Sequence, residues 1–168
     1  MDDPMNPIGK VASTLLLSLV MVVAVYPALP MGRVDLEVEV EALKEVPLVE
    51  LKLGELYVHH YGARENNGRF TLIEDVAIKA SGLNPEIHRY VARIPYGSYD
   101  EIRMEFSEAK AYIGGETLEL DVSRGIFEEN LTLDLWGEAH LKVVLHIDEG
   151  KALANHTLSM DVEVISLK

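Results

Sequence analysis

The sequence contains no cysteine and no glutamine. Without cysteine, the chain can form no disulfide, no thiolate metal or iron–sulfur site and no cysteine-nucleophile active site. The absence of glutamine beside 28 aspartate and glutamate residues is typical of hyperthermophile composition. Apolar residues make up 48% of the 168 positions, which is enough to fill the core of one domain.

Basic side chains are scarce. The chain has 15 lysine and arginine residues against 28 acidic ones, and its formal net charge is −13 at pH 7. A protein that neutralises a phosphate backbone needs clustered Lys and Arg, and the sequence has no basic run. We therefore expect no nucleic-acid partner.

The motifs of common enzyme classes are also missing. The sequence has no G-x-S-x-G elbow, no Walker loop, no H-E-x-x-H and no dinucleotide-binding glycine pattern. Acidic residues are so numerous that two of them lying close together carries no information about catalysis. We therefore predict that the protein is not an enzyme and has no catalytic residue and no cofactor.

Histidines are the remaining candidates for a metal centre, and there are six of them: His59, His60, His88, His140, His146 and His156. His140, His146 and Asp148 are expected on the same outward face of one strand, because residues an even number apart point the same way. His140 and His146 would nevertheless lie about 20 Å apart, which is too far for one shared ion. We predict no metal centre at these residues.

Charged side chains are absent from residues 11–32, which lie between Lys10 and Arg33. As a helix, these 22 residues would be roughly 33 Å long, enough to cross a hydrocarbon core of about 30 Å. We predict that residues 11–32, called here the anchor segment, are held in the lipid bilayer.

A cleaved signal peptide is the main alternative for the anchor segment, because its densest apolar part, residues 15–26, has the length of a signal h-region. Signal peptidase prefers small residues at positions −3 and −1. The available pairs, Ala24 with Tyr26, Tyr26 with Ala28, and Ala28 with Pro30, all fit poorly. A buried core helix is disfavoured, because a helix that is apolar on every face has no solvent side in a small domain. An uncleaved anchor is therefore favoured.

The anchor segment divides the chain into residues 1–33, with the tail and the anchor, and an acidic domain, residues 34–168. The first part holds two basic and two acidic side chains, so the domain carries 13 basic and 26 acidic ones. One basic residue flanks the anchor on each side, and the free amino terminus tips the balance toward an inside N-terminus. We expect a single-pass protein of the cell membrane whose C-terminal domain is extracellular.

Residues 34–168 show apolar residues at alternate positions, which is typical of half-buried strands. The expected strands are 34–42, 49–58, 70–73, 87–94, 102–113, 118–122, 131–135, 141–147 and 158–164. A bulge at Gly54-Glu55 restores the inward face of the second strand. We expect at most one short helix, at 74–81, and a loop at 148–155. The fold class predicted is all-β, an antiparallel β-sandwich of about seven to nine strands after an N-terminal transmembrane or signal helix.

Four acidic residues form one face of the first expected strand: Asp35, Glu37, Glu39 and Glu41. Like charges on one strand face repel each other unless they meet basic side chains or metal ions. A solvated edge or basic partners on neighbouring strands is favoured over a calcium site. This acidic stripe is one candidate interaction surface.

Exposed aromatic residues and glycosylation motifs are further candidates. Trp136 is expected on the outward side of its strand, and Tyr57 and Tyr99 could join it in a sugar-binding platform. Covering of these rings by long loops is favoured over such a platform. The sequons Asn130-Leu131-Thr132 and Asn155-His156-Thr157 fit an exported, glycosylated domain. Asn155 is expected in a loop and Asn130 at the start of a strand.

Several short motifs resemble one known family. The stretch Ile94 to Met104 (IPYGSYDEIRM), followed by residues 109–113, Gly114-Gly115-Glu116 and residues 118–120, resembles the signature of the uncharacterised extracytoplasmic family called domain of unknown function 4382. Upstream, residues 56–59 and 67–73 resemble its early strand and the aromatic that follows it. The resemblance covers residues 49–165.

The resemblance implies a β-sandwich held outside the cytoplasmic membrane of archaea and bacteria. Many members of the family are lipoproteins attached through a cysteine, which this sequence lacks. The anchor segment is then the only tether available. The family has no established catalytic residues, so the resemblance assigns no role to any residue here.

Two functions fit these observations. The first is a non-enzymatic, membrane-anchored surface module that binds a ligand, a glycan or a neighbouring envelope protein. The second is a structural subunit of an extracellular filament, in which residues 34–42 leave their own sandwich and complete the sheet of a neighbouring copy. The break at Pro47 and an edge-like strand pattern motivate the second.

Overall fold

The structure, a computed structural model, describes residues 30–63, 68–82, 84–123 and 125–167. It divides the chain into two units, Met1–Pro30 and Met31–Lys168. Most of the anchor segment lies outside the described residues, and its last two residues, Met31 and Gly32, belong to the first strand. No helix in the described part of the chain has the length and hydropathy of a membrane span.

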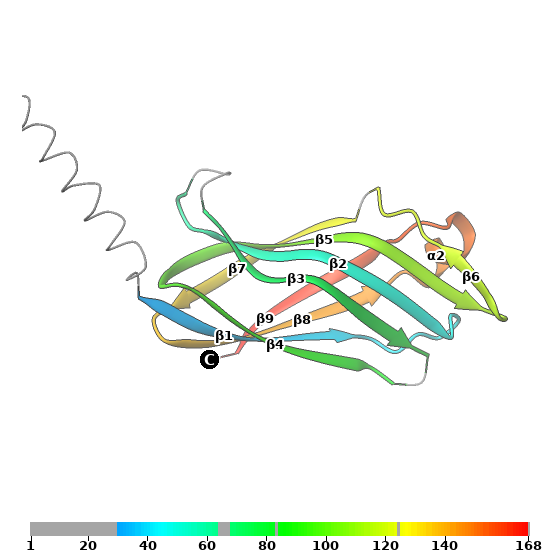
Figure 1. The fold of residues 1–168 in the computed structure, drawn as a ribbon, viewed down its shortest axis with the longest axis horizontal. Helices are drawn as coiled ribbons and strands as arrows, with labels where there is room; N and C mark the ends of the chain where they lie inside the picture. The colour runs from blue at the N-terminus through cyan, green and yellow to red at the C-terminus, as the bar shows by residue number, and fades with distance from the viewer. Residues whose placement is uncertain (1–29, 64–67, 83, 124, 168) are drawn as a thin grey trace, which may run out of the picture. The chain divides into compact units, whose positions relative to one another are not determined.

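The second unit contains nine strands and one short helix in its described residues. These are β1 (Met31–Val40), β2 (Leu48–His60), β3 (Arg69–Ser81), β4 (Glu86–Pro95), β5 (Gly97–Ile113), β6 (Glu116–Glu119), β7 (Ile126–Leu135), β8 (Glu138–Ile147), α2 (Glu149–Asn155) and β9 (Met160–Leu167). One sheet, called sheet A, has the order β4-β1-β8-β9. The other, sheet B, has the order β3-β2-β5-β6, and β7 also pairs with β5 (Figure 1). The predicted mostly-β, two-sheet fold is confirmed.

Strand β1 lies inside sheet A. It pairs antiparallel with β4 and parallel with β8, with Val38 opposite both His88 and Val143. The prediction of a purely antiparallel sandwich is therefore wrong at this pair. The edge-like reading of β1 is also wrong, because both of its sides are hydrogen-bonded within the chain.

The core lies between the two sheets and is built from the alternate residues of each strand. In β1 these are Val34, Leu36, Val38 and Val40, and all four are at most 1% exposed. In β2 the inward phase changes between Leu53 and Leu56, and both are fully buried because the register with β5 shifts around Gly54. The predicted bulge at Gly54-Glu55 is confirmed.

Two predicted elements are wrong. The helix expected at residues 74–81 is the second half of β3, in which Ile78 and Ala80 are buried beside β2. The loop expected at 148–155 contains α2, whose N-cap residue Asp148 accepts a hydrogen bond from the Lys151 backbone N–H. Strand β2 supplies the β3 backbone with hydrogen-bond partners, which a helix-like spacing does not reveal.

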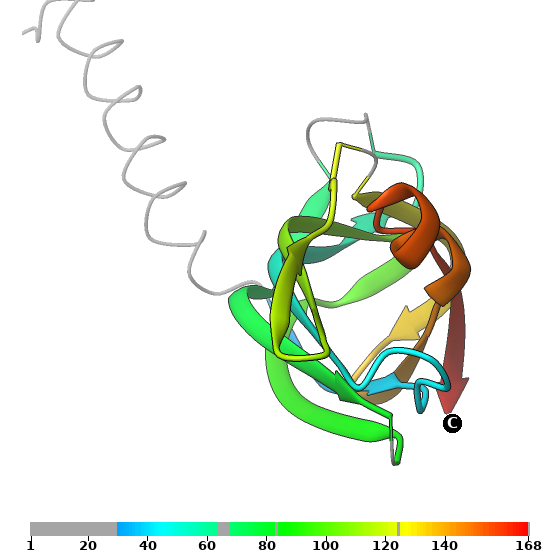
Figure 2. The same ribbon diagram turned by 90° about the vertical axis from the view of Figure 1, so that its right-hand side faces the viewer.

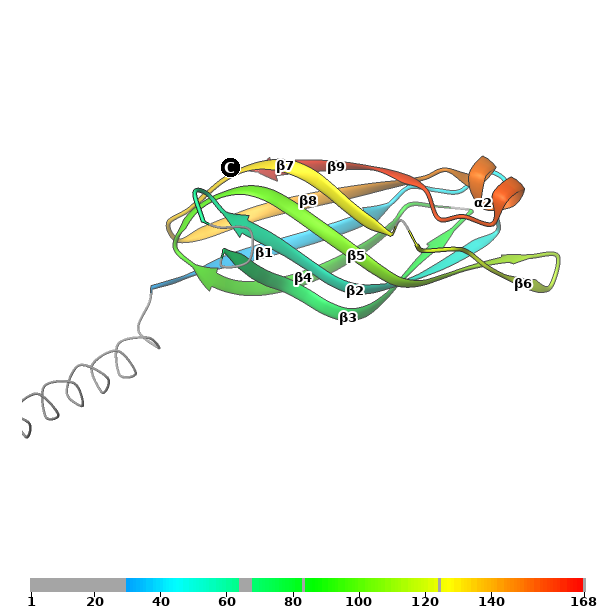
Figure 3. The same ribbon diagram turned by 90° about the horizontal axis from the view of Figure 1, so that it is seen from above.

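The two ends of the sandwich differ. Figure 3 shows α2 and the β5–β6 hairpin at one end, and Figure 2 looks onto that end. We call it the distal end. The opposite end, called the proximal end, carries the start of β1, the β4–β5 turn and the β7–β8 turn. Strand pairing holds these three segments together, because Met31 pairs with Pro95 and Gly97 pairs with Leu135.

Candidate functional site

The acidic stripe lies on the outer face of sheet A, and each of its carboxylates has a cationic or imidazole partner. The partners are Arg33 and His140 for Asp35, Arg89 for Glu37, Lys142 for Glu39, and His146 for Glu41. Neighbouring strands supply most of them, because β1 lies between β4 and β8. The prediction that the stripe faces basic residues is confirmed.

The geometry of the stripe is tight near its middle. The Lys142 ammonium lies 2.6 Å from a Glu39 carboxylate oxygen, and Arg89 Nε lies 3.0 Å from Glu37. The hydrogen bond to Glu39 raises the pKa of Lys142. Such paired carboxylates are already balanced in charge, so a cation would have to displace Lys142 or Arg89 to reach them.

The described residues of this face form no preorganised metal site. Among the described residues, no three histidine, aspartate or glutamate side chains converge closely enough to hold an ion. The Nδ1 atom of His146 lies 2.9 Å from a carboxylate oxygen of Glu41. Asp148 caps the N-terminus of α2 instead of facing His146 as a ligand. A calcium site on the stripe stays the disfavoured alternative.

A hollow of about 400 Å³ lies over the proximal half of the stripe. Its lining residues include Arg33, Asp35, Glu37, Arg89 and His140. The side chains of the ion pairs just described therefore form much of the wall of this hollow.

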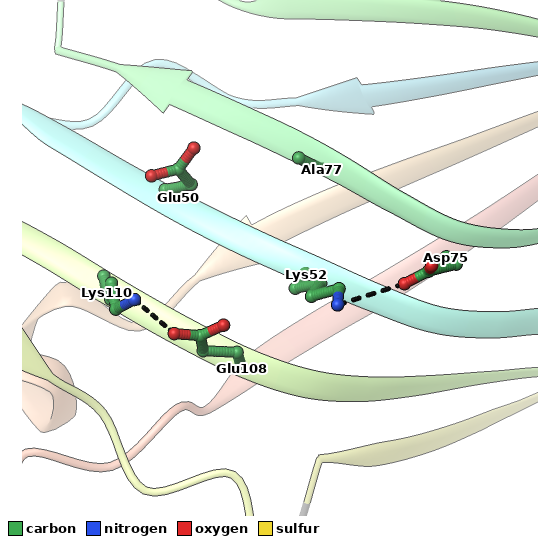
Figure 4. Close-up of a pocket in the computed structure, with 6 residues that line it drawn as sticks. All are labelled: Glu50, Lys52, Asp75, Ala77, Glu108 and Lys110. Atoms are coloured by element: carbon green, nitrogen blue, oxygen red, sulfur yellow. Dashed lines mark ion pairs between the residues drawn. The ribbon is translucent and has the colours of Figure 1, made fainter.

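A second hollow, of about 330 Å³, lies on the outer face of sheet B, and sequence analysis missed it. It is lined by Glu50, Lys52, Asp75, Ala77, Glu108 and Lys110, from strands β2, β3 and β5 (Figure 4). We call it the sheet B hollow. Its two drawn ion pairs are Lys52 with Asp75 at 3.1 Å and Lys110 with Glu108.

Opposite charges alternate in the sheet B hollow. The strand register places Glu50 beside Lys110, and Lys52 beside Glu108, so each charge has an opposite charge as its cross-strand neighbour. The small side chain of Ala77 lies opposite Lys52 on β3. The sequence contains a signal for this arrangement. Two residues apart on a strand means the same face, and this spacing occurs in Glu50-x-Lys52 and in Glu108-x-Lys110.

Hydrogen bonds fix the charges at the edge of the sheet B hollow. Glu50 accepts a hydrogen bond from the Tyr112 hydroxyl at 3.0 Å and lies 3.4 Å from the Lys79 ammonium. Tyr112 and Lys79 lower the pKa of Glu50, and the same hydrogen bond raises the pKa of Tyr112. The hydrogen bond to Glu108 raises the pKa of Lys110. Each group therefore keeps its ordinary charge at neutral pH.

The three aromatic candidates have different surroundings. Trp136 is 71% exposed, so its predicted outward position is confirmed. Tyr57 is only 4% exposed, because the Arg69 guanidinium covers its ring at 3.7 Å from the centroid. Tyr99 is 2% exposed and donates its hydroxyl hydrogen bond to the Pro95 carbonyl at 2.6 Å. Tyr57 and Tyr99 therefore do not join Trp136 in an aromatic platform. The favoured interpretation that the rings are covered holds for Tyr57 and Tyr99 but not for Trp136.

Both sequon asparagines are exposed. Asn130 lies within β7, opposite Glu101 of β5, and not at the start of a strand. Asn155 is the last residue of α2 and not part of a loop, and its carbonyl accepts a hydrogen bond from the Thr157 hydroxyl. Glycosylation of either residue stays a prediction.

Comparison with known proteins adds no relative to this description. No family model matches the chain, and no curated protein matches it. The resemblance to domain of unknown function 4382 therefore stays a prediction, and the proposals that follow depend on the geometry and the sequence of this chain.

Proposed function

We propose that this chain is a single-pass, membrane-anchored binding module of the cell surface and not an enzyme, with its sandwich outside the cell and related to domain of unknown function 4382. Residues 11–30 have no charged side chain and lead directly into β1. The acidic domain is repelled by anionic lipid headgroups and so extends into solvent. This supports a tethered module.

The sheet B hollow carries the binding part of the proposal. Its volume of about 330 Å³ lies in the range of small-ligand sites. Three carboxylates and two ammonium groups line it, so hydrogen-bond acceptors and donors alternate across neighbouring strands. A hydroxyl group both donates and accepts, and it can bridge a carboxylate and an ammonium group without disturbing their charge balance. The ligand class that fits best is a neutral glycan of the cell envelope.

Charge argues against other ligands. A polyanion would meet Glu50, Asp75 and Glu108, and a cation would meet the ammonium groups of Lys52 and Lys110. Either ligand would meet side chains of its own charge in the hollow, which weakens binding. A neutral, polyhydroxylated ligand meets neither penalty.

The binding proposal is tested with the full chain in lipid nanodiscs and fluorescently labelled neutral envelope polysaccharide. We expect Lys52→Gln and Glu108→Gln each to weaken binding at least tenfold. Lys142→Gln removes the same charge from the outer face of sheet A and should leave binding unchanged. Equal affinity of all four proteins, or no binding by the unchanged chain, would contradict the proposal.

The anchoring proposal is tested in whole cells. We expect the chain to stay in the membrane fraction at alkaline pH, and externally added protease to remove the domain from intact cells. Recovery of the full-length chain in the soluble fraction would contradict the anchor, and protection from protease would contradict the orientation.

A second function, filament assembly by strand addition, is favoured by the position of β1. This strand comes first in its unit, and only residues 41–47 connect it to the other strands. It fills the space between β4 and β8, so its departure would leave two open strand edges that a β1 from another copy fits. We propose this exchange as the alternative function of the chain.

Strand exchange is tested by a disulfide that reports which copy holds β1. Glu37 and Lys142 are direct register partners on the outer face of sheet A, and the chain has no other cysteine. In the Glu37→Cys/Lys142→Cys variant, exchange predicts a ladder of covalent multimers on a non-reducing gel. A closed monomer alone would contradict exchange, and the Glu37→Cys single variant controls for random cross-linking.

A further inference from the structure

Exposed aromatic and apolar side chains gather at the proximal end. Trp136 is 71% exposed, Tyr61 is 69% exposed and Met31 is 46% exposed. The ring of the half-buried Tyr96 lies 6.2 Å from that of Trp136, tilted by 59°. Large apolar groups that are exposed together mark interaction sites. The exposed rings therefore indicate a contact surface on this otherwise acidic domain.

Backbone contacts hold these four residues at the same end, although they come from separate parts of the chain. The Tyr61 N–H donates to the Ser98 carbonyl at 2.8 Å, next to the β4–β5 turn that contains Tyr96. The Arg33 N–H donates to the Gly137 carbonyl at 2.8 Å, which joins the start of β1 to the turn that contains Trp136. These hydrogen bonds therefore place the four residues at the same end of the sandwich.

The linker between the dense apolar run, residues 15–26, and β1 is short. The dense apolar run ends at Tyr26, and β1 begins at Met31, so residues 27–30 are all that connects them. Four extended residues reach at most about 14 Å. The start of β1 must therefore stay close to whatever surface holds the run. The other end of the ten-residue β1 lies about 30 Å from its start, which is beyond the reach of these four residues.

The chemistry of the proximal end fits the lipid–water boundary. Tryptophan and tyrosine prefer the headgroup layer because an apolar ring and a polar N–H or O–H can each meet a suitable environment there. The domain carries nearly all the negative charge of the chain, so zwitterionic headgroups suit it better than anionic ones.

We propose that the proximal end rests on the headgroup layer of a zwitterionic bilayer, with Trp136 and Tyr61 inserted as its lipid contacts. This inference depends on the proposed anchor. It adds that the sandwich does not move freely above the membrane but stands on it, with the distal end and α2 directed away from the lipid.

The only tryptophan of the chain reports on this contact. The full chain is reconstituted into phosphatidylcholine vesicles that contain lipids brominated near the glycerol level. We expect Trp136 emission to shift to the blue, to lose at least half its intensity to the brominated lipid, and to become at least twofold less sensitive to iodide. Emission typical of a water-exposed ring, with full iodide quenching and none by lipid, would overturn the proposal.

Substitutions separate a specific contact from mere proximity. Tyr61→Ser should reduce the lipid quenching of Trp136 at least twofold, with unchanged circular dichroism. Ile126→Ser removes a 57% exposed residue at the far end of β7 and should leave the quenching unchanged. Equal quenching in both variants would overturn the role of Tyr61. An emission shift caused by added polysaccharide, without lipid quenching, would overturn lipid contact in favour of a glycan site.

Vesicle flotation distinguishes the two proposals. If the chain floats with the vesicles and Trp136 stays exposed to water, the anchor stands and the lipid contact is wrong. If the chain does not float with the vesicles, the anchor itself is wrong, and the lipid contact is overturned with it.

Discussion

The carboxylate of Glu149, the first residue of α2, accepts a hydrogen bond from the backbone N–H of Val46 at 2.7 Å. The N–H groups of Lys44 and Glu45 donate to the same carboxylate at 2.7 and 2.6 Å. Three consecutive N–H groups around one anion form a compact binding turn. This contact fixes the segment by which the chain passes from β1 in sheet A to β2 in sheet B.

We predict that Glu149→Gln destabilises the domain by about 1–3 kcal/mol at pH 7, because the backbone donors lose an ionised acceptor. Urea unfolding measures the difference. Glu45→Gln removes the same charge from the neighbouring segment, and its backbone N–H is retained, so it should have little effect. Equal stability of the two variants would contradict the role of the carboxylate.

The effect of Glu149 should depend on pH. Burial alone would raise the pKa of Glu149, but the hydrogen bonds from Lys44, Val46 and Glu45 outweigh it, and the pKa is lowered. A carboxyl with a lowered pKa in the fold stabilises it above its ordinary pKa, near 4.3, and loses that contribution as the pH falls through the folded value. The gap between the unchanged chain and Glu149→Gln should therefore close in acid, as unfolding curves between pH 7 and pH 2 would measure.

Tyr99 should be among the last tyrosines to ionise. Its ring lies in the core, and burial raises the pKa of Tyr99 to about 12. Because the folded pKa lies above the ordinary value near 10, the stability that Tyr99 contributes is complete below pH 10 and is lost as the pH rises toward 12. Ultraviolet titration should show a late step that Tyr99→Phe removes. The control Tyr61→Phe, at an exposed tyrosine, should leave this late step in place.

The ion pairs of the acidic stripe should control how the domain responds to salt. In the Arg89→Gln/Lys142→Gln variant, Glu37 and Glu39 lose their partners and repel each other on β1. We expect a lower melting temperature at low ionic strength that 1 M salt or millimolar calcium restores, because both screen this repulsion. Arg93→Gln, also on an outward position of β4, should show no such salt dependence.

Gly32 should tolerate no side chain. A Cβ at this position would lie 2.4–2.8 Å from the terminal carbons of Leu135, which is fully buried. We predict that Gly32→Ala costs about 1–3 kcal/mol, because the neighbouring core must shift. Guanidinium unfolding measures the loss. If the clash is the cause, Gly32→Ala should cost less in a Leu135→Ala background than in the unchanged chain.

Alternation along the chain was enough to predict which side chains form the core. It placed Val34 to Val40 correctly, and it located the bulge at Gly54 because the inward phase changes there. It could not predict that β1 pairs with β8 in parallel. A period of two fixes the face on which a side chain lies, but it carries no information about which strand lies alongside.

The wrong elements have local causes. In residues 74–81, apolar spacing and the following Gly82 imitate a helix with its terminal glycine, yet pairing with β2 outweighs that preference. In α2, Gly150 lowers the helix propensity, and seven residues are too few for a periodic pattern. The sheet B hollow was missed because its charges come from strands far apart in the sequence, and their meeting depends on the register.

The position of β1 has a mechanical consequence. Under the proposed anchoring, a pull from the membrane would reach the domain at Met31 and load β1 along its axis, while a partner bound to the rest of the sandwich would resist it. Hydrogen bonds to β4 and β8 run across that axis on both sides, so they are loaded in shear and must break together instead of one by one. Strand β1 is thus hydrogen-bonded on both sides at the point where such a load would act, and this geometry is suited to bearing tension.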